Sequence, residues 1–94
     1  MLNGKQRRAL RALAVNTKAL VQIGKGGLSA NLVESTEVSL EAHELVKITV
    51  LKNCDDNVKE MALDLASMTN SELVQVVGRV IVLYRPSKKK LITI

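Results

Sequence analysis

The sequence predicts an α/β fold, a two-layer sandwich of helices on a four-stranded sheet. Three observations support this class. The apolar residues alternate along the chain between the three-to-four-residue spacing of helices and the two-residue spacing of strands. The resulting order of elements is α-β-α-β-α-β-β, with β-α-β crossovers that should be right-handed. The 94 residues, of which 47% are hydrophobic, suffice for one domain with one core.

The first half of the chain is expected to form a helix over about 3–16, a strand over 19–23 and a second helix over about 30–42. Ser29 can cap the second helix, because a serine oxygen accepts a hydrogen bond from a backbone N–H of the first turn. The apolar side of the first helix is expected to carry Leu2, Ala9, Leu10 and Leu13, and that of the second Leu32, Val33, Thr36 and Leu40.

The second half is expected to add one helix and three strands. Residues 45–51 alternate as a strand does, and Asp55 and Asp56 open a helix at the positive end of its dipole. Two strands follow, 73–77 and 80–84. The last strand is apolar on both faces, so we expect it inside the sheet. The third helix is expected to bury Val58, Met61, Ala62, Leu65 and Met68.

We expect one domain over residues 1–86 and a loose basic tail over 87–94. No apolar run approaches the ~20 residues that span a bilayer, and no signal-peptide pattern opens the chain. Cys54 is the only cysteine, which excludes an intramolecular disulfide and a multi-cysteine metal site. A cytoplasmic monomer without contact to a membrane is the expectation.

The charges are segregated along the sequence. Residues 1–33 carry six basic residues and no acidic one, residues 34–72 carry all nine acidic residues against three lysines, and residues 73–94 carry five basic residues. A basic surface formed by the two ends of the chain would attract a polyanion. The first helix is the clearest case, because Arg7, Arg8 and Arg11 have no acidic residue beside them. A chance distribution of charge, or a merely soluble helix, is the alternative.

The segment Gly24-Lys25-Gly26-Gly27 lies between a predicted strand and a predicted helix. Its glycines let the backbone approach another molecule closely, and the helix N-terminus that follows favours an anion. We interpret it as a clamp on a phosphate backbone, lying side by side with the first helix. The alternative is a tight connection that needs only small residues. The segment matches neither the phosphate-loop pattern nor the dinucleotide fingerprint.

Catalysis is not favoured. His43 has only Glu41 and Glu44 close to it in sequence, and Cys54 fits a small apolar filler better than a nucleophile. The acidic residues of the second helix indicate a solvated face rather than a metal site. We therefore expect a protein that is not an enzyme and holds no metal and no cofactor.

Four segments together are similar to a known family. They read LNGKQRR at 2–8, QIGKGGL at 22–28, ELVK at 44–47 and ELVQVVGRVIVLYR at 72–85. In order and spacing they resemble the bacterial YhbY family, whose members are stand-alone versions of the CRM domain. The resemblance implies a fold similar to the C-terminal domain of translation initiation factor three, with a mixed sheet in the order 1-2-4-3.

The resemblance also implies RNA binding through a Gly-x-x-Gly loop and association with precursors of the large ribosomal subunit. We therefore expect a ribosome assembly factor that binds precursor ribosomal RNA, with ribosomal proteins as candidate neighbours. Stacking of Tyr84 on a base is left open. The alternative is a protein–protein adaptor that uses Glu34, Glu37 and Glu41 and binds RNA incidentally. The expected RNA contacts are Lys5, Arg7, Arg8, Arg11, Lys18, Gly24, Lys25, Gly26, Gly27, Arg79 and Arg85.

Overall fold

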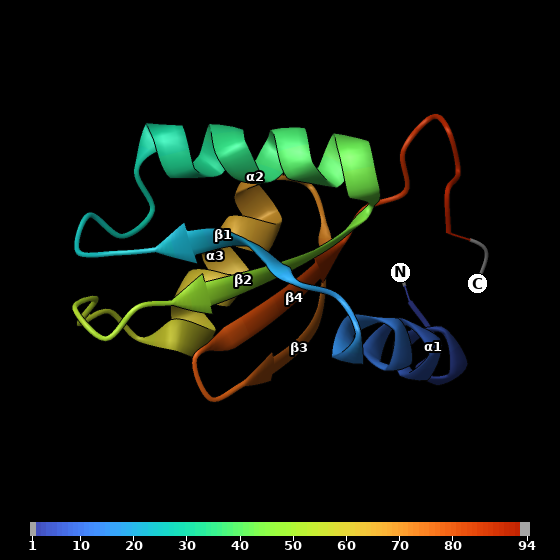
Figure 1. Ribbon diagram of the computed structural model, residues 1–94, viewed down its shortest axis with the longest axis horizontal. Helices are drawn as coiled ribbons and strands as arrows, with labels where there is room; N and C mark the ends of the chain where they lie inside the picture. The colour runs from blue at the N-terminus through green and yellow to red at the C-terminus, as the bar shows by residue number, and fades with distance from the viewer. Residues whose placement is uncertain (1, 93–94) are drawn as a thin grey trace.

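The computed structural model describes residues 2–92 and has the predicted order of elements (Figure 1). The strands hydrogen-bond in the order β1-β2-β4-β3, with β1 parallel to β2 and the other neighbours antiparallel, which confirms the expected sheet. No helix within this range is long and apolar enough to cross a membrane. The elements are α1 (Gly4–Val15), β1 (Ala19–Ile23), α2 (Ala30–His43), β2 (Leu45–Val50), α3 (Val58–Met68), β3 (Glu72–Val77) and β4 (Val80–Tyr84).

Strand β4 lies inside the sheet, between β2 and β3. Successive side chains of a strand point to opposite faces, so β4 needs apolar residues at every position. Ile81 and Leu83 are buried in one cluster, and Val82 and Tyr84 are buried in another on the opposite face. The interior position predicted from its two apolar faces is confirmed.

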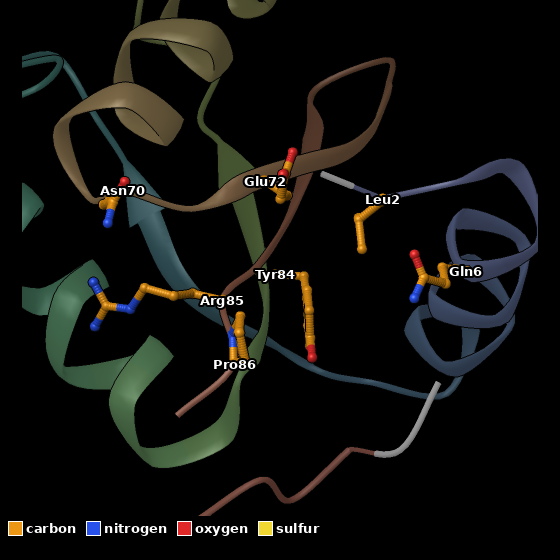
Figure 2. Close-up of a pocket in the computed structure, with 7 residues that line it drawn as sticks. All are labelled: Leu2, Gln6, Asn70, Glu72, Tyr84, Arg85 and Pro86. Atoms are coloured by element: carbon orange, nitrogen blue, oxygen red, sulfur yellow. The ribbon is translucent and has the colours of Figure 1, made fainter. Parts of the chain in front are cut away.

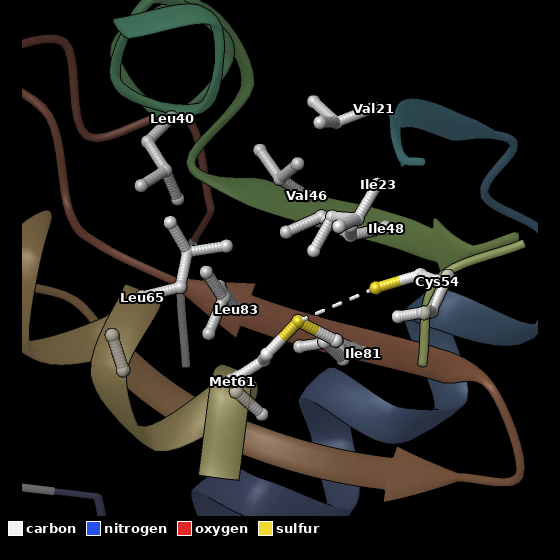
Figure 3. Packing of buried hydrophobic residues seen from close by; sticks show 13 residues of the cluster. Val21, Ile23, Leu40, Val46, Ile48, Cys54, Met61, Leu65, Ile81 and Leu83 are labelled. Atoms are coloured by element: carbon white, nitrogen blue, oxygen red, sulfur yellow. Dashed lines mark hydrogen bonds between the residues drawn. The ribbon is translucent and has the colours of Figure 1, made fainter. Parts of the chain in front are cut away.

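Helices α2 and α3 cover one face of the sheet and enclose the larger core (Figure 3). In Figure 3, Leu40 of α2 and Leu65 of α3 point toward the strands. Cys54 is buried there with its Sγ 3.8 Å from Sδ of Met61, so this thiol packs as an apolar side chain. The buried members of the core are Val21, Ile23, Leu40, Val46, Ile48, Val50, Cys54, Met61, Ala62, Leu65, Ala66, Ile81 and Leu83.

Helix α1 covers part of the other face. It packs on the end of the sheet where β2 begins and β4 ends, and its buried residues meet Leu45, Val74, Val82 and Tyr84. The side assigned to α1 from the sequence was wrong at two positions, because Ala9 and Leu13 are exposed. Leu10 and Ala14 are buried instead, at a spacing of four residues on one helical face.

The C-terminal segment is bound to the core, so the expectation of a loose tail was wrong for residues 87–92. The carboxylate of Glu44 is fully buried and accepts hydrogen bonds from the backbone N–H and hydroxyl of Ser87, at 2.7 and 2.6 Å. It also accepts one from the backbone N–H of Ile92 at 2.8 Å. The partners are more than forty residues apart in sequence, and no local pattern indicated them. Residues 93 and 94 lie outside the described range.

Candidate nucleic-acid interface

Helix α1 begins at a capping box. The side chain of Asn3 accepts a hydrogen bond from the backbone N–H of Gln6 at 2.8 Å, and the side chain of Gln6 accepts one from the backbone N–H of Asn3 at 3.0 Å. The box fixes the first turn despite the low helix propensity of Gly4. Because Leu10 and Ala14 are buried against the sheet, Lys5, Arg8 and Arg11 are exposed to solvent. We call these three the cationic side of α1.

Arg7 is separate from this cationic side. Its guanidinium group donates hydrogen bonds to the backbone carbonyls of Leu73 and of Val74, the latter at 3.4 Å. Arg7 is half-buried and lies three residues before Leu10 on the face that meets the sheet. It therefore joins α1 to β3, and its expected role as an RNA contact is not supported by its position.

The glycine turn, residues 24–27, closes with a hydrogen bond from the N–H of Gly27 to the carbonyl of Gly24 at 3.0 Å. Gly27 has φ +62°, and a Cβ there would lie 2.8 Å from Oδ2 of Asp56. The positive φ favours glycine at 27, and a larger residue would also displace the carboxylate of Asp56. At Gly26 a Cβ would meet nothing within 4 Å. Gly26 and Lys25 are exposed at the tip and are free to approach another molecule.

The glycine turn and α1 lie at opposite ends of the molecule, whose longest dimension is 35 Å (Figure 1). The expectation that they lie side by side and form one cradle was wrong. The reason is the path of the chain. Strand β1 begins four residues after the last residue of α1 and ends at the glycine turn, and its five extended residues separate its two ends by about 16 Å. Lys18 is exposed in the loop just before β1, between α1 and the glycine turn.

Arg79 is bound within the protein. Its Nε donates to the carbonyl of Val50 at 2.9 Å, and its terminal nitrogen donates to the carbonyls of Leu51 and of Cys54, the latter at 3.0 Å. These bonds tie the β3–β4 turn to the segment between β2 and α3. Two of its three guanidinium nitrogens therefore donate to carbonyls within the protein, so its position does not support the expected role of Arg79 as an RNA contact.

Arg85 is also bound, on the side of α2. It donates to the carbonyl of Thr69 at 2.7 Å, and it lies 3.4 Å from a carboxylate oxygen of Glu37 and from one of Glu41. Its surroundings are acidic and on the sheet face opposite to α1. We therefore remove Arg85 from the candidate surface together with Arg79.

Tyr84 cannot stack on a base in this conformation. It is 6% exposed, and burial together with the nearby charge of Glu44 raises the pKa of its hydroxyl. Beside it is a pocket of about 390 Å³ between α1, the start of β3 and the end of β4 (Figure 2). The residues that line this pocket are Leu2, Gln6, Asn70, Glu72, Tyr84, Arg85 and Pro86.

The sequence reasoning did not include Lys88, Lys89 and Lys90 among the site residues. All three are exposed on a turn that starts at Ser87, and this turn lies at the same end of the molecule as α1 (Figure 1). We call residues 87–90 the lysine turn. The run of three lysines was visible in the sequence, but the buried partner that holds it was not.

Within residues 2–92, no group of three or more His, Cys, Asp or Glu side chains is arranged to hold a metal ion. His43 is exposed at the last position of α2. The candidate surface is therefore made of cations and exposed backbone, which suits binding of a polyanion.

Comparison with known proteins decides the family. The family model of the CRS1 / YhbY (CRM) domain matches residues 2–85. This chain belongs to the CRS1/YhbY family of CRM domains. The match ends at residue 85, so the lysine turn lies outside the part that the CRM model covers.

Several relatives of this CRM domain are named for RNA. The chain is 43% identical over 89 residues to the "Probable RNA-binding protein YqeI" of Bacillus subtilis, covering 95% of this chain and 93% of that protein. It is 33% identical to an "RNA-binding protein" of Haemophilus influenzae, covering 94% and 89%. The solution structure of the hypothetical protein SAV1595 from Staphylococcus aureus, described as a candidate RNA-binding protein, aligns with TM-score 0.80 and 51% identity over 94% of this chain and 92% of that one.

Proposed function

We propose that this CRM-domain protein binds RNA, acts by binding rather than by catalysis, and associates with precursor ribosomal RNA of the large subunit. One observation carries the proposal: Lys5, Arg8 and Arg11 are exposed on α1, and the first acidic residue of the chain is Glu34. Repulsion among these cations destabilises the helix unless a bound polyanion neutralises them. The names of the relatives point to RNA as that polyanion.

In the proposed complex, one RNA strand follows the edge strand β1 from the cationic side of α1 to the glycine turn. Lys18 and Gln22 are exposed along this path, and Lys25 is exposed at its far end. Contacts at the two ends of β1 thus replace the single cradle expected from the sequence. Phosphate contacts of this kind position RNA without reading its bases, so specificity comes from RNA shape or from neighbouring ribosomal proteins.

The test of RNA binding is the double variant Arg8→Gln/Arg11→Gln, measured by fluorescence anisotropy with a labelled fragment of precursor large-subunit RNA over a salt series. Loss of two phosphate contacts should weaken binding and reduce the slope of log K against log salt by about 1.4, at about 0.7 per contact to single-stranded RNA. The control is Lys59→Gln, an exposed lysine of α3. Equal slopes for the double variant and the control would reject the role of α1.

The ribosomal partner needs a separate test. Crosslinking the protein to RNA in cells, followed by sequencing of the attached fragments, should return precursor ribosomal RNA of the large subunit. Fragments spread over messenger RNAs would contradict this partner and leave RNA binding in place.

A second candidate function, the protein–protein adaptor, is favoured by a groove between α2 and α3. The groove has a volume of about 680 Å³ and combines acidic with apolar side chains. Val38 is 64% exposed, and Met68 is 57% exposed although the sequence predicted it to be buried. The residues that line the groove are Leu28, Ala30, Val33, Glu34, Glu37, Val38 and Met68.

Glu34 offers the clean test of the adaptor, because Glu37 and Glu41 are already paired with Arg85. The variant Glu34→Lys should abolish binding of a basic protein partner and leave the RNA isotherm of the wild type. If Glu34→Lys leaves every protein interaction intact after nuclease treatment, the adaptor hypothesis is wrong.

A further inference from the structure

The lysine turn has a defined backbone. The N–H of Lys90 donates to the carbonyl of Ser87 at 3.2 Å, and the N–H of Lys89 donates to the hydroxyl of Ser87 at 3.2 Å. Lys90 adopts φ +48°, which reverses the chain and returns it toward the core. Three consecutive lysines are therefore exposed on a short closed turn.

The buried side chain of Glu44 anchors the lysine turn to the core. Besides the carboxylate bonds to Ser87 and Ile92, its N–H donates to the carbonyl of Leu40 at 2.8 Å, and its carbonyl accepts from the N–H of Arg85 at 2.9 Å. Its backbone has φ +66°, an uncommon value for a residue with a side chain. One buried residue thus connects the end of α2 to the end of β4 and to the C-terminal segment.

The lysine turn and α1 share one end of the molecule. Ile92, just after the turn, packs against the same cluster as Leu2 and the buried residues of α1, Leu10 and Ala14. The pocket in Figure 2 is lined by Gln6 on α1 and by Pro86 just before the turn, so the two cationic elements border one hollow.

The charge at this end is mainly positive. Six cations are exposed on the two elements, and the acidic groups nearby are Glu44, which is buried under the turn, Glu41, which is paired with Arg85, and Glu72, which lines the pocket. The exposed cations are Lys5, Arg8, Arg11, Lys88, Lys89 and Lys90.

We propose that the lysine turn is a second phosphate-binding site for RNA, held in place by Glu44 and acting together with the cationic side of α1. This inference rests on the proposed function. A loose tail would lose conformational entropy on binding, whereas a turn that is already fixed avoids that cost. The turn lies beyond residues 2–85, the region matched by the CRM family model.

The first experiment removes the charges. The triple variant Lys88→Gln/Lys89→Gln/Lys90→Gln should reduce the salt slope of RNA binding by about 2, at about 0.7 per lost contact. The single variant Lys89→Gln should reduce it by about 0.7, against no change for Lys59→Gln, which removes the same charge from an exposed site on α3. A triple variant with the slope of the wild type would overturn the proposal.

The second experiment releases the turn without removing a lysine. Glu44→Gln raises the net charge of the protein by one, so charge alone predicts tighter RNA binding. The proposal predicts weaker binding, together with loss of amide exchange protection in residues 87–92 while the sheet stays protected. If Glu44→Gln does not fold, Ser87→Ala, which removes the 2.6 Å hydroxyl bond, takes its place. A released turn with unchanged or tighter binding would overturn the role of Glu44.

Measuring Arg8→Gln/Arg11→Gln in parallel separates two kinds of failure. If the arginine variant weakens RNA binding and the lysine variants do not, this inference alone fails. If neither set has an effect, the proposed function fails with it. If the lysine variants keep RNA binding but lose binding to phosphatidylglycerol vesicles, the turn serves a membrane surface and the inference is wrong.

Discussion

The end of the molecule that holds the glycine turn and the end that holds α1 differ in backbone shape and in charge. At the first, the backbone is exposed at Gly26, but Asp56 lies against the turn and an acidic pocket of about 360 Å³, with Glu60 and Asp64, is next to it. At the second, the backbone is an ordinary helix and a turn, but six exposed cations surround it. The backbone that another molecule can approach closely and the cations that would attract a polyanion therefore lie at different ends of the molecule.

This difference shows that a glycine-rich motif and a basic helix need not be parts of one surface. Glycine can be required at a position of such a motif for two reasons: the backbone conformation of the fold, or the close approach of a ligand. At Gly27 the fold favours glycine, because the residue has φ +62°, whereas Gly26 has open space around it and is available to approach a ligand. The two ends can therefore be perturbed independently.

The largest effect is expected from Arg79→Ala, at the end with the glycine turn. Loss of bonds to the carbonyls of Val50, Leu51 and Cys54 should lower the free energy of unfolding by about 3 kcal/mol, measured by urea denaturation. For the Arg79→Ala protein that remains folded, the slope of log K for RNA binding against log salt should equal that of the wild type. A stable variant with a slope reduced by about 0.7 would return Arg79 to the RNA surface, as the sequence suggested.

A smaller effect is expected from the two glycines. Gly27→Ala should cost about 2 kcal/mol of stability, because the residue has positive φ and its Cβ would meet Asp56. Gly26→Ala should leave the thermal midpoint near that of the wild type and weaken RNA binding. Equal stability losses in the two variants would contradict the division between fold and ligand.

At the α1 end, the lysine turn should detach in acid. Burial alone would raise the pKa of Glu44, but hydrogen bonds from Ser87, Ile92 and Leu91 outweigh it and lower that pKa to about 2. A depressed pKa means that the carboxylate holds the turn fully above the unfolded pKa of about 4.3 and loses it as pH falls toward 2. The amide protection factors of residues 87–92, which are corrected for the pH dependence of intrinsic exchange, should therefore fall over this window, and the fall should be absent in Glu44→Gln.

The smallest effect is expected from Lys25→Ala. It removes one exposed charge at the glycine turn, so the salt slope should shrink by about 0.7 or less, with no change in stability. Isotherms that match the wild type at every salt concentration would show that RNA is held at the α1 end alone.

The sequence predicted the elements well because their periodicity is local. Val80 to Leu83 is apolar at every position, and this placed β4 inside the sheet before any contact was known. The buried side of α1 was not predictable in the same way. Arg7 faces the sheet because its guanidinium group reaches carbonyls of β3 more than sixty residues away.

The candidate site was predicted in part. The exposure of Lys25 and of the cationic side of α1 agrees with their assignment, although their contact with RNA stays a prediction. Arg85 was assigned from its charge, but Thr69, Glu37 and Glu41 bind it. The lysine turn was missed because its order depends on Glu44, and the sequence gives no sign that a buried carboxylate will meet Ser87.

The packing of Leu2 and Ile92 on one cluster has a practical consequence for handling this protein. A purification tag attached at either terminus would emerge beside the cationic end and compete with whatever binds there. A fluorophore for binding assays is better attached through a cysteine introduced at Ser67, which is exposed on α3. The native Cys54 is buried and should not react in the folded protein.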